Sequence, residues 1–110
     1  MRVAVDASEY RSQLYPDGLQ RYLRNLLRAL AKAGRGTRFS LLGGHSLGGF
    51  RRELLGLGYE ASSHAADVTH YPVFYSQYLG CGPGKTVVTI PDLIFIHRPG
   101  DYHPRTRDSL

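Results

Sequence analysis

A glycine at the start of a long amphipathic segment is the residue of this sequence best suited to meet a ligand. Gly18 follows the short apolar run Arg2–Asp6 and a polar gap, and it directly precedes the segment Leu19–Ala33. Glycine lets the backbone approach a phosphate closely, and the unpaired N–H groups at the start of a helix favour negative charge. The pattern therefore predicts an anion-binding turn between a buried strand and a helix.

A second motif, Gly44-His-Ser-Leu-Gly-Gly49, satisfies G-x-S-x-G and lies between a predicted strand and a predicted helix. In a nucleophile elbow such a serine attacks an acyl group, with an acid and then a histidine following in the chain. That order is met by Ser46 followed by Asp67 or Asp92 and then by His97 or His103. Only one predicted strand and one helix precede the strand that leads into the motif, so the alternative is a loop in which Ser46 caps the next helix.

The elements that must position these residues follow from hydrophobic periodicity and from glycine and proline boundaries. The predicted strands are Arg2–Asp6, Arg38–Leu42, Asp67–Tyr71 and Thr86–Ile90, and the predicted helices are Leu19–Ala33 and Phe50–Leu55. Alternation of strands and helices predicts an α/β fold, a Rossmann-like doubly wound domain with a mainly parallel sheet and helices on both faces. Residues 1–110 form one such domain. Three loops, at 7–18, 72–79 and 91–104, are expected at the carboxyl edge of the sheet.

Composition narrows the class of partner. The 110 residues are 42 % apolar and carry a formal net charge of +5, which favours anionic partners such as phosphates or a lipid surface. The single cysteine, Cys81, excludes a disulfide within the chain, and no long apolar span is visible, so a cytoplasmic location is expected. The five histidines have no metal-ligand spacing, and no nucleic-acid-binding motif is present, so neither a metal nor a nucleic acid is expected.

Several segments together resemble the amino-terminal domain of family-4 glycosyltransferases of the GT-B fold. These segments match in order and spacing over nearly the whole chain. They are Val3–Ala7, Gly18–Tyr22, Leu26–Leu30, Asp67–Pro72, Lys85–Leu93 and Pro99–Pro104. The resemblance implies the acceptor-side, amino-terminal half of a GT-B fold, which faces a separate carboxyl-terminal domain that binds a nucleotide-diphosphate sugar.

The same resemblance assigns roles to individual positions. Gly18 and Arg21 correspond to the side that meets the donor diphosphate, Asp92 to a catalytic position, and His70 to the acceptor or sugar side. Tyr75 is expected on that side too, as part of an aromatic cluster after the third strand. The family's histidine before the aspartate is Pro91 here, and proline offers neither a side-chain donor nor an N–H. The expected function is retaining sugar transfer from a nucleotide-diphosphate sugar to an acceptor hydroxyl without a cofactor or metal, and the isolated chain is expected to be inactive.

Three further interpretations concern partners. Four basic residues, Arg21, Arg24, Arg28 and Lys32, form a stripe on the first helix that would suit a membrane surface if the acceptor were lipid-linked, or that is simply solvated. The aromatic residues Tyr71, Phe74, Tyr75 and Tyr78 form either a sugar-stacking platform or a packed rim. An exposed edge strand would favour a homodimer. A binding or assembly domain without catalysis is the alternative to both enzyme readings.

Overall fold

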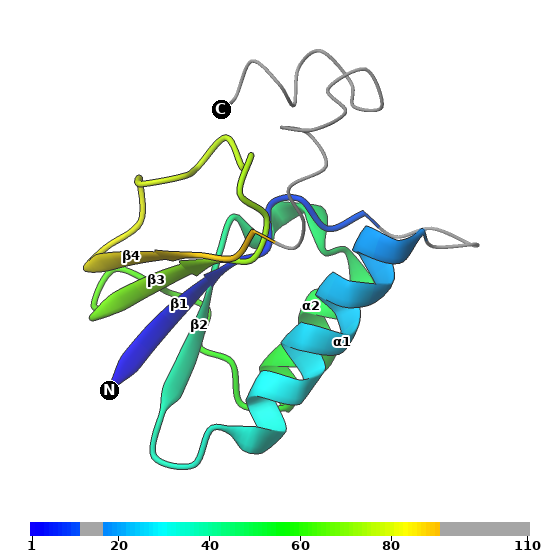
Figure 1. The fold of residues 1–110 in the computed structure, drawn as a ribbon. Helices are drawn as coiled ribbons and strands as arrows, with labels where there is room; N and C mark the ends of the chain where they lie inside the picture. The colour runs from blue at the N-terminus through cyan, green and yellow to red at the C-terminus, as the bar shows by residue number, and fades with distance from the viewer. Residues whose placement is uncertain (12–16, 91–110) are drawn as a thin grey trace.

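The computed structural model describes residues 1–11 and 17–90 of the chain. Within them, four strands form one parallel sheet in the order β2-β1-β3-β4 (Figure 1). The strands are β1 (Arg2–Asp6), β2 (Arg38–Leu42), β3 (Val68–Tyr71) and β4 (Lys85–Val88). The predicted α/β class and parallel sheet are confirmed, and the first two strands have the predicted bounds. The third strand begins one residue later than predicted, and the fourth is shifted toward the amino terminus.

Helix α1 (Gly18–Ala33) begins where Asp17 caps it, because the Asp17 carboxylate accepts a hydrogen bond from the Gln20 N–H at 2.9 Å. The helix ends at Gly34, whose N–H donates to the carbonyl of Leu30 at 3.1 Å. A side chain at Gly34 would collide with the ring of Phe39, so glycine allows β2 to start directly beneath the helix end. A 3-10 turn (Gly44–Ser46) and helix α2 (Gly49–Gly56) follow β2.

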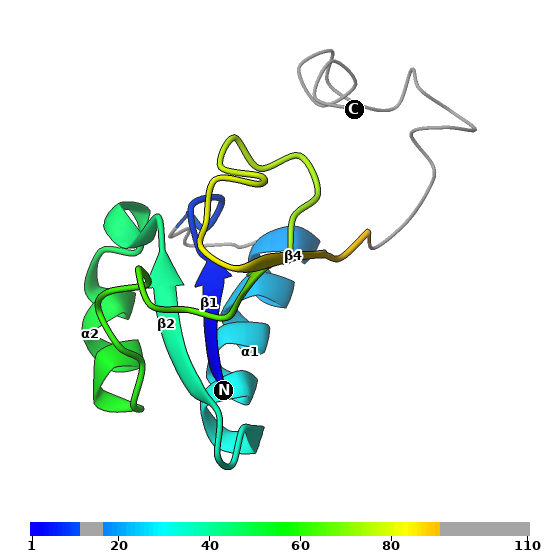
Figure 2. The ribbon, with the colours of Figure 1, turned by 90° about the vertical axis from the view of Figure 1, so that its left-hand side faces the viewer.

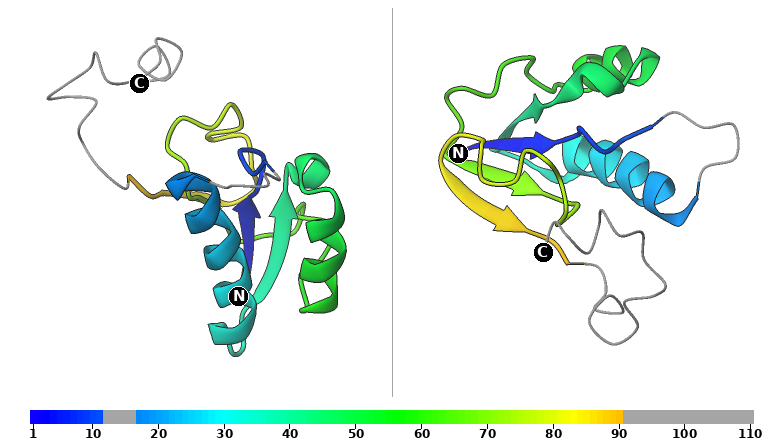
Figure 3. Two further views of the ribbon diagram at one scale, coloured as in Figure 1. Left: turned by 90° about the vertical axis from the view of Figure 1, so that its right-hand side faces the viewer. Right: turned by 90° about the horizontal axis from the view of Figure 1, so that it is seen from above.

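Both helices lie on the same face of the sheet (Figure 1; Figure 3, left). Leu23 of α1 and Leu54 of α2 are fully buried in one cluster with Val5 of β1, and Arg28 of α1 forms an ion pair with Glu53 of α2. The prediction of helices on both faces is therefore wrong for the described residues. The reason is that α2 leads to a further pairing beyond β2, and the return to β3 contains no helix.

That further pairing is a parallel bridge between Glu60 and Ser40 of β2, with the Glu60 N–H donating to the carbonyl of Phe39 at 2.7 Å. The chain then crosses the helix-free face of the sheet from residue 61 to residue 67 before β3 begins, as Figure 2 shows in front of β2 and β1. The bridge was not predicted, because only one residue pairs and no strand-like apolar run accompanies it.

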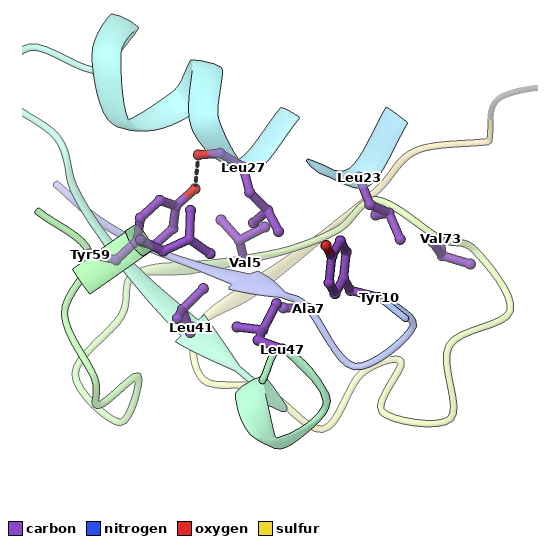
Figure 4. Packing of buried hydrophobic residues seen from close by; sticks show 10 residues of the cluster. Val5, Ala7, Tyr10, Leu23, Leu27, Leu41, Leu47, Tyr59 and Val73 are labelled. Carbon is purple, nitrogen blue, oxygen red and sulfur yellow. Dashed lines mark hydrogen bonds between the residues drawn. The ribbon is translucent and has the colours of Figure 1, made fainter. Parts of the chain in front are cut away.

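The core lies between the sheet and the two helices (Figure 4). Leu23 and Leu27 of α1 are fully buried, with Leu27 pointing toward Val5 and Leu23 toward Tyr10, and each such side chain contributes about 1.5–3 kcal/mol by burial. Tyr59 extends this core past the edge of β2, and its hydroxyl donates to the carbonyl of Leu27 at 2.8 Å. Packing against α1 thus covers β1 and β2, whose register is set by their backbone pairing.

The connection from β3 to β4 folds back onto the opposite face of β3. The buried Tyr71 hydroxyl accepts a hydrogen bond from the Gly82 N–H at 2.7 Å, and the Thr69 hydroxyl donates to the carbonyl of Pro83 at 2.6 Å. Gly84 has φ +73°, and a side chain there would overlap the carbonyl of Asp67. These contacts fix β4 beside β3, although all four residues of β4 remain exposed.

Candidate functional site

The best-placed ligand site of this sheet lies outside the carboxyl ends of β1 and β3. The chain leaves β1 toward β2 on one side, and it leaves β3 toward β4 on the other, so the two connections diverge. In open parallel sheets a ligand binds in the crevice where strand connections diverge in this way. The view from above in Figure 3 (right) looks onto this end of the sheet, with the loop after β3 near that after β1.

Three serines join the loops at this edge. The hydroxyls of Ser8, after β1, and Ser76, after β3, lie 3.2 Å apart and are both buried. The Ser46 hydroxyl, after β2, donates to the carbonyls of Ala7 and Ser8 at 3.3 Å each. Hydrogen bonds therefore connect all three strand ends before any ligand is present.

A buried carboxylate lies beneath these loops. Asp6, the last residue of β1, is 3 % exposed, and its Oδ1 accepts a hydrogen bond from the Ser8 N–H at 3.1 Å. Its Oδ2 is buried and has no hydrogen-bond partner among residues 1–11 and 17–90. A buried carboxylate oxygen without a hydrogen bond is energetically unfavourable, which sets Asp6 apart from the other buried polar residues of these loops.

Gln20 connects the loop after β1 to the first turn of α1. Its Oε1 accepts from the Arg11 N–H at 2.6 Å, and its Nε2 donates to the carbonyl of Glu9 at 3.0 Å. Sequence analysis missed this role, although Asp17-x-x-Gln20 has the spacing of a helix-capping pair. Gln20 is 6 % exposed and thereby fixes the direction in which α1 enters the site.

Gly18 and Arg21 lie at the exposed start of α1. No heavy atom lies within 4 Å of where a side chain on Gly18 would begin, so packing of the described residues does not require glycine there. Arg21 is exposed, and its side chain forms no hydrogen bond or ion pair with the described part of the chain. Both predicted residues are therefore accessible, and neither is required by the fold.

Tyr75 belongs to the loop after β3 and lies near the start of α1. Burial raises the pKa of its hydroxyl, and the negative charges of Glu9 and Asp17 raise that pKa further. Its ring packs edge-on against Phe74, with the ring centres 5.1 Å apart. The structure thus brings the predicted aromatic residue Tyr75 to the same region as Gly18.

His70 has a different environment, on the side of the site next to β4. Its Nε2 lies 2.8 Å from the Thr89 hydroxyl, and partial burial lowers the pKa of its imidazole. Burial therefore favours the neutral form of this ring, which is linked to the β4 side of the sheet. Asp92, the predicted catalytic residue, lies outside the described residues, as do Pro91 and the whole loop 91–104.

The elbow interpretation of Ser46 is not supported by its surroundings. No residue other than glycine has a positive φ in the described parts of the chain, so Ser46 lacks the strained turn of such a nucleophile. Asp67 lies at the amino end of β3, where its carboxylate accepts from the Arg2 N–H at 2.9 Å. Asp67 and Ser46 are thus at opposite edges of the sheet, and Asp67 cannot act with Ser46. The other partners of that interpretation, Asp92, His97 and His103, lie outside the described residues.

Within residues 1–11 and 17–90, no group of three or more histidine, cysteine, aspartate or glutamate side chains is arranged to hold a metal ion. None of the helices described is both long and apolar enough to cross a bilayer. Comparison of the chain with models of known families, with curated proteins and with solved structures finds no match.

Proposed function

We propose that this chain is the acceptor-side domain of a GT-B-type glycosyltransferase, which transfers a sugar from a nucleotide-diphosphate sugar to an acceptor hydroxyl together with a donor-binding domain. The observation that supports this most directly is that Asp17, the cap of α1, lies close enough to raise the pKa of Tyr75, near the point where the connections of β1 and β3 diverge. That is the position at which an open parallel sheet binds ligands.

In this proposal each residue of the site contributes one interaction. The N–H groups at the start of α1, next to Gly18, and the Arg21 guanidinium would stabilise the departing diphosphate. The ring of Tyr75 would stack against the acceptor sugar, and neutral His70 would accept or donate one hydrogen bond to a sugar hydroxyl. Asp92 keeps its predicted catalytic role. The domain therefore contributes orientation and electrostatic stabilisation, and the second domain supplies most of the donor affinity.

Amide chemical-shift mapping with UDP-glucose, GDP-mannose and simple glycosides as probes tests the proposal. We expect weak binding, with shifts confined to residues 17–21 and to the loop after β3. Arg21→Gln should weaken nucleotide-sugar binding, whereas Arg35→Gln, an exposed arginine beyond the end of α1, should not. Shifts spread evenly over the surface, or equal losses in both variants, would contradict the proposal.

A further inference from the structure

The second site of interest lies at the amino edge of the sheet, away from the proposed glycosyl-transfer site. Arg2 begins β1 and Arg38 begins β2, and the two are paired in register on adjacent parallel strands. Residues paired in this way point to the same face of a sheet, here the helix-free face. Two like charges are thus held beside each other, which costs free energy unless an anion intervenes.

One carboxylate partly neutralises this pair. Glu60 lies 2.9 Å from the Nε of Arg38, in an ion pair whose arginine side chain is 63 % exposed. The Arg2 guanidinium has no carboxylate within 4 Å among the residues that the structure describes. The Arg2 guanidinium therefore forms no ion pair with the described residues, although the Asp67 carboxylate lies at the same edge and accepts from the Arg2 backbone N–H.

A cavity of about 80 Å³ opens beside these side chains, between β1, β2 and the segment that crosses the helix-free face. Its polar lining comes from Arg2, Arg38, Ser40, Glu60, Ser62 and His64. This volume is about half of the ~150 Å³ that holds a benzene ring. The cavity therefore fits a group of a few heavy atoms and excludes a nucleoside or a whole sugar.

The cavity wall also carries a serine hydroxyl. Ser40 is 5 % exposed, and its hydroxyl forms no hydrogen bond with residues 1–11 or 17–90. Ser62 and His64 at the mouth are hydrogen-bonded to each other through the Ser62 hydroxyl and the His64 Nδ1. The Ser40 hydroxyl therefore keeps a free donor at the wall of the cavity.

We infer that this cavity binds the oxyanion of a phosphate group. Two guanidinium groups and a serine hydroxyl supply donors, and a tetrahedral oxyanion can accept from both arginines at once. The Glu60 carboxylate orients Arg38 through its Nε and leaves the terminal nitrogens of Arg38 for the ligand. A cation is disfavoured, because two positive charges face one negative charge. This inference does not depend on the proposed glycosyltransferase function.

Titration of the protein with inorganic phosphate, followed by amide and arginine Nε–Hε chemical shifts, tests the inference. We expect saturable shifts at Arg2 and Ser40, and a melting temperature that rises with phosphate. Arg2→Gln should weaken binding about tenfold and Ser40→Ala about threefold, as expected for lost hydrogen bonds to an anion. The control Arg52→Gln removes an equal charge from the exposed surface of α2 and should change affinity less than about twofold.

Two further probes distinguish the source of the phosphate. Glycerol 3-phosphate tests a soluble monoester, and phosphatidylcholine vesicles with phosphatidic acid test a lipid headgroup. The probe that carries the recognised phosphate should bind the parent protein and should bind the Arg2→Gln variant more weakly. Shifts that never saturate, or equal weakening by Arg2→Gln and Arg52→Gln, would show that phosphate responds only to the net charge, and the inference would then be wrong.

Discussion

The hydroxyls of Ser8 and Ser76 lie 3.2 Å apart, although 68 positions separate them in the chain. They meet because β3 pairs with β1 and not with β2, the strand that precedes it in the sequence. Each residue belongs to the loop that leaves one of the two diverging strands. This pair therefore joins the two halves of the proposed ligand site directly.

Removing one of these hydroxyls should destabilise the fold. Ser8→Ala leaves the buried Ser76 hydroxyl short of a partner, which costs about 1–3 kcal/mol. Ser76→Ala should cost more, because the Ser76 Oγ also accepts from the Tyr78 N–H at 3.2 Å. Urea denaturation of the two single variants and the double variant measures this. The double variant should lose less than the sum of the single losses, and strict additivity would show that the two hydroxyls do not interact.

Tyr59 should make the free energy of unfolding depend on pH in the alkaline range. Burial raises the pKa of its hydroxyl above the ordinary value of 10.0, so the folded state holds this proton more tightly than the unfolded chain. Its contribution to stability is complete below pH 10 and is lost as the pH rises above that value. Denaturation at increasing pH should show this decline in the parent protein.

Tyr59→Phe should remove that component of the decline and should cost about 1 kcal/mol at neutral pH, through the lost hydrogen bond to Leu27. Tyr22→Phe is the matched control, because Tyr22 packs against the same core and its hydroxyl forms no hydrogen bond with the described residues. If both variants show the same alkaline slope, Tyr59 is not the group responsible.

His70 should make the free energy of unfolding depend on pH in the acidic range. Burial lowers the pKa of its imidazole below the ordinary value of 6.5, so below that pH the unfolded chain binds the proton more readily than the folded protein. Stability should therefore be complete above pH 6.5 and should fall as the pH decreases. His70→Gln should flatten this part of the stability profile. Thr89→Val, which removes the hydroxyl partner and keeps the imidazole, should leave an acidic slope in place.

The strands β1 and β2 could be predicted from the local sequence pattern. The pairing of Glu60 with β2 could not. β1 and β2 are each short, largely apolar runs bounded by polar residues or glycine, and their predicted bounds are those observed. The pairing of Glu60 with β2 depends on a single backbone contact, which leaves no periodic signal in the sequence. The predicted helix Phe50–Leu55 is present as α2, but without knowledge of that contact its face of the sheet was not predicted, and helices were expected on both faces.

The residues of the candidate site could likewise be predicted only in part. Gly18 was predicted because a glycine before an amphipathic segment allows close approach of a ligand to the backbone, and Tyr75 because aromatic residues cluster after a strand. Their roles in binding stay predictions. Ser8 and Ser76 were missed, because a serine hydroxyl has no characteristic spacing and their contact arises only from the order of the strands. Gln20 was also missed, although its spacing from Asp17 was visible.

Replacing Gly18 by alanine separates the requirements of the fold from those of the proposed ligand. No heavy atom lies within 4 Å of the added carbon, and Gly18 lies inside α1. Alanine has the higher helix propensity, so Gly18→Ala should leave stability unchanged or raise it by up to about 1 kcal/mol. Urea denaturation measures this effect. Gly84→Ala is the contrasting variant and should be strongly destabilising, since its backbone has φ +73° and the new carbon would overlap the carbonyl of Asp67.

Binding should respond to Gly18→Ala in the other direction. If a diphosphate approaches the start of α1 as closely as the proposed function requires, the added methyl group occupies part of its space and weakens its contact with the backbone N–H groups. Nucleotide-sugar binding, followed by amide shifts at residues 17–21, should then weaken while the protein remains fully folded. Unchanged binding in a stable Gly18→Ala protein would mean that no phosphate approaches this turn. The role of Gly18 would then be limited to starting the helix, and the diphosphate assignment would be wrong.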